Sequence, residues 1–200
     1  MSQLSSIAAS MYSDLSVNMP DVAHTAEELA AMDKDALLNL FATETYTTST
    51  ITPGSSDEFV RIINVREFPA MGTPPNVVNV PNYGSSTSQQ IQGQADAPSM
   101  EISLNYVAAE WAEDTLLGEM VGDGQQYVFR FTLLNAKPDG YQSDSVGGSI
   151  GLGTVENSIY FWVGKAEAKQ VTPQLTDAST MTLTLTMQSE FKGSYTVDGA

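Results

Sequence analysis

The sequence predicts a mainly β protein with one helix between its strands and an N-terminal helical arm. Residues 100–107 and 179–188 alternate polar and apolar side chains, a period of two that is typical of strands with one buried face. Other segments are rich in Val, Ile and Phe, which favour strands. Strands are therefore expected over these segments: 58–68, 76–80, 100–107, 127–134, 159–171, 179–188 and 190–197.

The chain divides into two parts of different composition. Residues 57–200 contain the predicted strands and form a β domain, whereas residues 1–56 form an arm that ends in a linker rich in Thr and Ser. Thr25 and Glu28 have the spacing of a capping box, so we expect a helix from Ala26 to about Met32.

A second short helix is expected in the arm, from Asp33 to Phe41. Helices of fewer than about 12 residues are marginal in water, so both need a surface on which to dock. We expect that surface to be a neighbouring subunit, with packing on the arm's own domain as the alternative. The apolar side chains that would make this contact are Leu29, Leu37, Leu40 and Phe41.

The flanking helix is expected near residue 111, between two strands. Ala108, Trp111, Ala112 and Leu116 have helical spacing, and Gly118 is placed to end the helix. Two long segments rich in Pro, Gly, Ser and Asn, 69–98 and 137–153, contain loops with few apolar anchors, and we expect at least one of them to become ordered only on assembly.

The charge of the chain limits its partners. The 200 residues hold 24 Asp and Glu but 8 Lys and Arg, giving a net charge of −16, and the basic residues are scattered along the sequence. Such a surface repels nucleic acid and anionic lipid, so we expect neither specific DNA binding nor a membrane. Neither a secretory signal nor a membrane span is recognisable, so synthesis in the cytoplasm is expected.

The sequence shows no pattern that indicates catalysis. It has no cysteine, and His24, the one histidine, reads as a surface side chain beside a helix cap. The glycines at 148, 151 and 153 lack the Lys and Ser or Thr of a phosphate-binding loop. We therefore expect no enzymatic activity, no cofactor and no metal.

Six segments, taken in order, resemble a known family. They are IINVREFPAMG, NVVNV, MEISLNYV, YVFRFTLL, SIYFWVGKAEA and MTLTLTMQSEFKG. They resemble the major tail tube protein of long-tailed (siphovirus-type) bacteriophages over residues 57–200. The resemblance implies a β-sandwich with one flanking helix. It also implies a structural virion protein made in the host cytoplasm and located in the tail, which forms stacked hexameric rings. Inner strands of neighbouring subunits would form a shared β-barrel around a lumen through which phage DNA passes into the host.

The same resemblance implies partners and a lining for the tube. The partners would be further copies of the chain and the tape measure, tail terminator and distal tail proteins. Because Glu101, Ser103 and Asn105 form the polar side of their strand, they are the candidates to face the lumen. An acidic lining would keep DNA from adsorbing over about one Debye length, roughly 8 to 10 Å.

Two other classes of function remain open from the sequence. One is another virion β-sandwich, either a tail terminator or a capsid decoration protein. The other is a non-enzymatic β-sandwich that binds a carbohydrate or another ligand.

Overall fold

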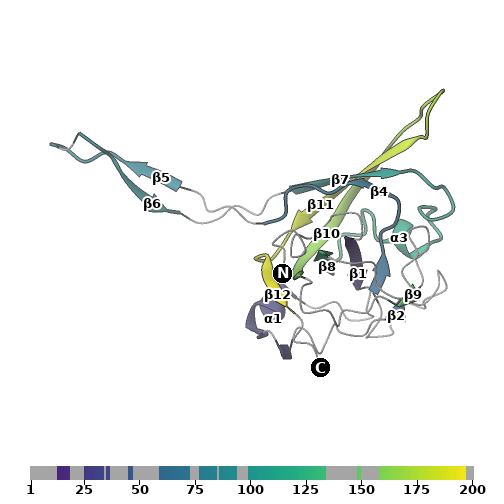
Figure 1. Ribbon diagram of the computed structural model, residues 1–200, viewed down its shortest axis with the longest axis horizontal. Coiled ribbons are helices and arrows are strands. Elements are labelled where there is room, and N and C mark those ends of the chain that lie inside the picture. The colour runs from purple at the N-terminus through teal and green to yellow at the C-terminus, as the bar shows by residue number, and fades with distance from the viewer. Residues whose placement is uncertain are drawn as a thin grey trace, which may run out of the picture.

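The chain folds into a mainly β structure, which confirms the predicted fold class (Figure 1). This computed structural model describes the following residues: 13–18, 25–33, 35–36, 45–46, 59–72, 77–84, 86–93, 99–133, 148–149 and 158–196. Predictions at other positions lie outside the described residues.

Eight strands form one curled antiparallel sheet. They are β1 (Asp14–Asn18), β3 (Phe59–Arg61), β4 (Val65–Glu67), β7 (Ser99–Asn105), β8 (Tyr127–Leu133), β10 (Ser158–Thr172), β11 (Thr180–Met187) and β12 (Lys192–Thr196). The order across the sheet is β3, β1, β8, β10, β11, β7, β4, with β12 paired to β10 beside this path. Two separate pairs are β2 (Thr45–Tyr46) with β9 (Gly148–Ser149), and β5 (Val77–Val80) with β6 (Gln89–Gln92).

The segment from β3 to β4 joins the two ends of this sheet. β3 pairs with β1 at one end, and β4 pairs with β7 at the other. The backbone N–H of Ile62 donates to Leu15 O at 2.8 Å, and that of Asn105 donates to Asn64 O at 2.9 Å. The prediction of one strand over 58–68 was therefore wrong at its centre. Asn64 has φ 61°, a left-handed conformation that asparagine tolerates and that turns the chain between the two edges.

The long strand β10 gives the curled sheet two halves. Residues 158–164 pair with β8, and β12 lies along the other side of this part of β10. Residues 164–172 pair with β11 instead. One half therefore contains β3, β1, β8, β12 and the start of β10, and the other contains β4, β7, β11 and the end of β10. Strands that pass from one sheet layer to another in this way build the corners of sandwiches.

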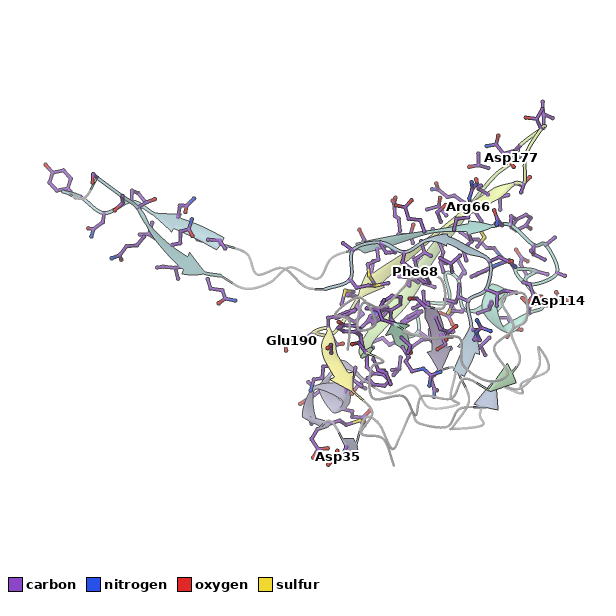
Figure 2. The ribbon with its side chains drawn as sticks, viewed as in Figure 1. Asp35, Arg66, Phe68, Asp114, Asp177 and Glu190 are labelled. Carbon is purple, nitrogen blue, oxygen red and sulfur yellow. The ribbon has the colours of Figure 1, made fainter. Side chains whose placement is uncertain are left out.

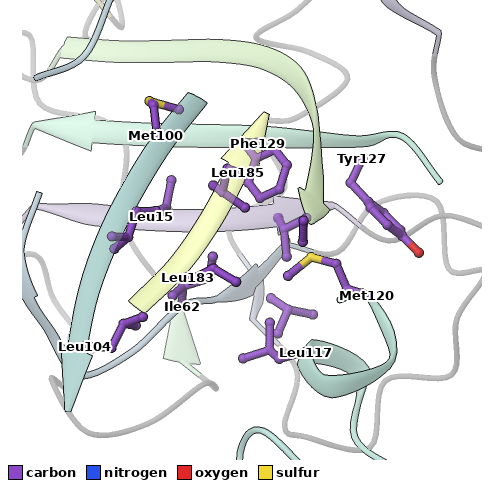
Figure 3. Close-up of a cluster of buried hydrophobic side chains, with 14 of the residues drawn as sticks. Leu15, Ile62, Met100, Leu104, Leu117, Met120, Tyr127, Phe129, Leu183 and Leu185 are labelled. Carbon is purple, nitrogen blue, oxygen red and sulfur yellow. The ribbon is translucent and has the colours of Figure 1, made fainter. Parts of the chain in front are cut away.

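The inner sides of both halves supply the main core (Figure 3). Leu15 and Phe129 come from the first half, and Leu104, Leu183 and Leu185 come from the second. All five are almost completely shielded from solvent. Burial of each such side chain contributes roughly 1.5 to 3 kcal/mol, so this layer is the principal source of stability.

The outer side of the first half is also buried, and its composition is partly polar. Asp14, Ser16 and Asn18 on β1 lie beside Arg130 and Thr132 on β8, and all five are at most 2% exposed. β1 was not predicted, because a short strand with polar residues at alternate positions and no flanking turn signal has no distinctive sequence pattern. The predicted domain boundary at residue 56 places β1 in the arm, although β1 belongs to the sheet.

Helix α1 (Ala26–Ala31) begins with the predicted capping box. Thr25 Oγ1 accepts from the backbone N–H of Glu28 at 3.2 Å, and Glu28 Oε2 accepts from that of Thr25 at 2.9 Å. Asp33 Oδ1 accepts from the backbone N–H of Ala36 at 2.8 Å, so a polar cap stands where the second helix is expected to begin. The rest of that helix lies outside the described residues.

The predicted helix around Trp111 is largely absent. Residues 108–115 form turns, and α3 covers only Leu116–Glu119. Thr115 causes this late start, because its Oγ1 donates toward the carbonyls of Glu110 and Ala112 and accepts from Gly118 N–H. Gly118 lies within α3 rather than ending it. A Cβ there would be 1.7 Å from Ala112 O, so close contact explains the glycine.

Candidate assembly surfaces

The outer side of the second half-sheet is a polar surface, which we call the polar face. Glu101, Ser103 and Asn105 point outward from β7, while Met100, Ile102 and Leu104 are buried. This confirms the predicted alternation of the strand. The lumen-facing role of the three polar residues stays a prediction.

Threonines from β11 extend the polar face. Thr180, Thr182 and Thr184 pair with Asn105, Ser103 and Glu101, respectively. The threonines of β11 are half-buried, whereas Met181, Leu183, Leu185 and Met187 are in the core. The polar face therefore presents hydroxyl, amide and carboxylate groups to solvent.

Two strand edges flank the polar face. No described strand pairs with β4 on the side away from β7. On β10, Ala166 O accepts from the N–H of Gly122 at 2.8 Å, and beyond this turn no described strand pairs with residues 167–172 on the side away from β11. Unpaired strand edges are templates for pairing with another chain.

The β5–β6 hairpin extends away from the body of the molecule (Figure 1). Every residue of both strands is exposed, including four apolar side chains, and Tyr83 in the turn is fully exposed. These side chains are Val77, Val78, Val80, Ile91 and Tyr83. Residues 68–95 contain no charged side chain, although the chain as a whole carries −16. The hairpin is a neutral, apolar surface on an acidic protein. β5 confirms the strand predicted over 76–80, and β6 is a further strand within the segment 69–98.

A second hairpin projects where β10 turns into β11. Asp177 lies near its end, on the opposite side of the body from the β5–β6 hairpin (Figure 2). Leu175 in this turn is fully exposed and Val171 is 42% exposed.

The arm is attached to its own chain at α1. Leu29 is fully buried, and Lys192 Nζ donates to Ala30 O at 2.6 Å and to Met32 O at 3.2 Å. Leu29 is therefore buried against its own chain, which is the alternative to docking on a neighbouring subunit. Leu37, Leu40 and Phe41 lie outside the described residues, as does most of the predicted loop 137–153, so their contact with a neighbour stays a prediction.

Ionisable groups in the described part of the chain do not gather into a metal site. Within it, no three His, Cys, Asp or Glu side chains come together in a way that could hold a metal. Tyr127 donates its hydroxyl proton to Asp123, and burial, reinforced by this carboxylate, raises the pKa of the phenol. That pair ties the turn before β8 to the strand. His24 lies outside the described residues.

Across the ranges that the structure describes, no helix is both long enough and apolar enough to span a bilayer.

Comparison with known proteins gives distant structural likenesses. No protein-family model and no curated protein matches the sequence. One similar chain belongs to the cryo-EM structure of the anti-feeding prophage (AFP) baseplate, with 11% identity, TM-score 0.44, and coverage of 74% of this chain and 88% of that chain. Another belongs to the hybrid solid-state NMR and cryo-EM structure of the SPP1 tail tube, also with 11% identity and TM-score 0.44, covering 96% of this chain and 81% of that one. At this identity, neither likeness identifies the chain.

Proposed function

We propose that this protein is a structural component of a phage tail, which polymerises as stacked hexameric rings into the hollow tube that conducts DNA into the host. The proposal begins from the resemblance of residues 57–200 to major tail tube proteins. The observation that carries it further is the polar face with an open edge on each side.

The order of strands across the polar face suits head-to-tail ring closure. β10, β11, β7 and β4 are adjacent in that order and each antiparallel to the next. With four strands of alternating direction, β4 of one copy and β10 of the next copy are also antiparallel. Repetition around a ring therefore gives one continuous antiparallel sheet with no free edge. A rotation that closes produces a ring rather than a filament.

The polar face would then line the lumen. It offers Glu67 and Glu101 together with neutral hydroxyl and amide groups, and Lys165, which pairs with Thr186 on the same side of the sheet, is half-buried. Such a wall repels phosphate groups and presents no clustered cations to bind them. DNA would pass without specific binding.

The β5–β6 hairpin would make contacts between stacked rings. Its exposed valines, Ile91 and Tyr83 gain from burial, and the absence of charge removes the repulsion that two acidic bodies would otherwise feel. An isolated two-stranded hairpin is marginally stable in water, so contact with another copy would stabilise it. The tape measure, tail terminator and distal tail proteins would bind at the ends or inside of such a tube.

Electron microscopy of the purified full chain tests this function. Long hollow tubes of uniform width are expected once the concentration exceeds a threshold. Solitary closed rings would favour a tail terminator instead. Particles that stay monomeric under all conditions would contradict assembly and favour a capsid decoration or ligand-binding protein.

A further inference from the structure

We propose that Arg66 of one subunit forms an ion pair with Glu167 of the next, and that this pair sets the register of the seam between β4 and β10. The inference rests on the proposed ring and names a contact within it. Its occupant is a second copy of this chain. Two β-bulges of opposite charge on the two open edges carry the argument.

The first bulge is on β4. Val65 pairs with Leu104 and Glu67 pairs with Ser103, so two steps along β4 correspond to one step along β7. Arg66 is the extra residue, and its side chain is exposed. Bulges are common at sheet edges, where they redirect a side chain.

The second bulge is on β10. Ala166 pairs with Leu185 and Ala168 pairs with Thr184, which makes Glu167 the extra residue. Glu167 is exposed, and its Oε1 accepts from Thr186 Oγ1 at 2.7 Å. This hydrogen bond holds Oε1 toward β11, while the exposed Glu167 stands at the place where the other edge of β10 becomes open.

The other basic residues are less available than Arg66 to pair with a carboxylate on a neighbouring subunit. Arg61 and Arg130 are buried, and Lys169 and Lys192 donate to backbone carbonyls. Lys165 is half-buried, and Lys34 and Lys137 lie outside the residues for which side chains are described. Within the described part of the chain, Arg66 makes no ion pair. A planar guanidinium at an open edge suits a carboxylate on a neighbour.

The pairing also fixes an offset between subunits. The register of the four strands within one subunit places these residues opposite one another: Glu67, Ser103, Thr182 and Gln170. Bringing Arg66 beside Glu167 therefore shifts the next subunit by three to four residues, about 10 to 13 Å at ~3.3 Å per residue. Over four strand spacings of about 4.8 Å, this stagger corresponds to a strand tilt of about 30°. Closed sheets require such a stagger and tilt, typically about 35 to 45°.

Charged residues and bulges can also protect an edge from pairing, which gives a rival explanation with the opposite prediction. The double variant R66A/E167A separates the two. Loss of edge protection would lower the threshold concentration for assembly, whereas loss of a seam contact would raise it. Sedimentation velocity of the full chain at a series of concentrations measures this threshold.

A charge exchange completes the test. R66E and E167R each place like charges at every seam, so each should raise the threshold by about tenfold or more at low salt. The double variant R66E/E167R has the wild-type net charge and should restore assembly toward the wild-type threshold. Added salt should narrow the difference between the single variants and the wild type.

The outcomes distinguish this inference from the proposed function. If the wild type assembles and the single variants assemble equally well, or if the double exchange gives no recovery, the ion pair is wrong while the ring stands. If the wild type does not assemble at all, both are wrong. Circular dichroism of each variant checks that the monomer keeps its β structure.

Discussion

Asp14 and Arg61 form a buried ion pair, with Arg61 Nε 2.6 Å from Asp14 Oδ1 and the two residues only 2% and 4% exposed. They are 47 positions apart in the sequence, and they join β1 to β3 on the outer side of the first half-sheet. Charges shielded to this degree depend on each other, because neither can be hydrated instead.

Asp14→Ala should strongly destabilise the fold, because it leaves the Arg61 guanidinium buried without this carboxylate. The expected loss in the free energy of unfolding is about 3 to 5 kcal/mol, measured by urea denaturation. The double variant D14L/R61M should recover most of this loss, since it removes both charges. A loss below about 1 kcal/mol for Asp14→Ala would show that the pair is not needed.

Lys192→Met should release α1 from the sheet. The lysine donates to two carbonyls at the end of the helix, and charged hydrogen bonds of this kind contribute about 1.5 to 3 kcal/mol each. Hydrogen exchange at the Leu29 amide, which donates to Thr25 O, should become faster while the amides of β10 keep their protection. Lys165→Met is a matched control on a neighbouring strand. Equal exchange in both variants would mean that Lys192 does not hold the helix.

Tyr127 should make stability depend on pH in the alkaline range. Its raised pKa means that the folded state keeps the phenolic proton where an unfolded tyrosine, with pKa about 10, has lost it. The stabilisation is therefore complete below pH about 10 and decreases as pH rises above it. Urea denaturation of the wild type and of Tyr127→Phe between about pH 8 and 11 measures the difference in stability. This range spans the pKa of about 10 of an unfolded tyrosine. A stability difference that stays constant over this range would contradict the effect.

Glu101→Lys should make assembled tubes retain DNA. The change replaces one negative charge on the polar face of each subunit by a positive charge. Short DNA should therefore bind at low salt and dissociate as salt is added. Glu113→Lys makes the same change of charge at an exposed turn outside the four strands of the polar face. Co-sedimentation of labelled DNA with tubes measures binding. If E101K tubes bind no more DNA than E113K tubes, Glu101 does not face the lumen.

The sequence predicted local structure correctly where one physical signal dominates. The alternation along β7 and β11 predicted which side chains are buried, because a strand exposed on one face requires it. The capping box at Thr25 was also found, since its geometry depends on residues three positions apart.

Elements that depend on distant contacts could not be predicted in this way. Asn64 turns the chain from one edge of the sheet to the other within the segment 58–68, and no local pattern marks where those edges lie. β1 is polar because Asp14 meets Arg61, a partner 47 residues away. The bulges at Arg66 and Glu167 are defined only by the strands that pair beside them. The open edges of the polar face were likewise visible only after the strand order was known.

Cysteine cross-linking between two singly substituted proteins tests the central claim, the pairing of β4 of one subunit with β10 of the next. The chain has no cysteine, so Arg66→Cys protein mixed with Glu167→Cys protein can form disulfides only at these two positions. A disulfide requires Cα atoms about 4.4 to 6.8 Å apart, which adjacent strands provide. In assembled mixtures we expect mainly heterodimers between the two variants on non-reducing gels. Tubes that give no heterodimers, or only Arg66→Cys homodimers, would contradict head-to-tail pairing of these edges.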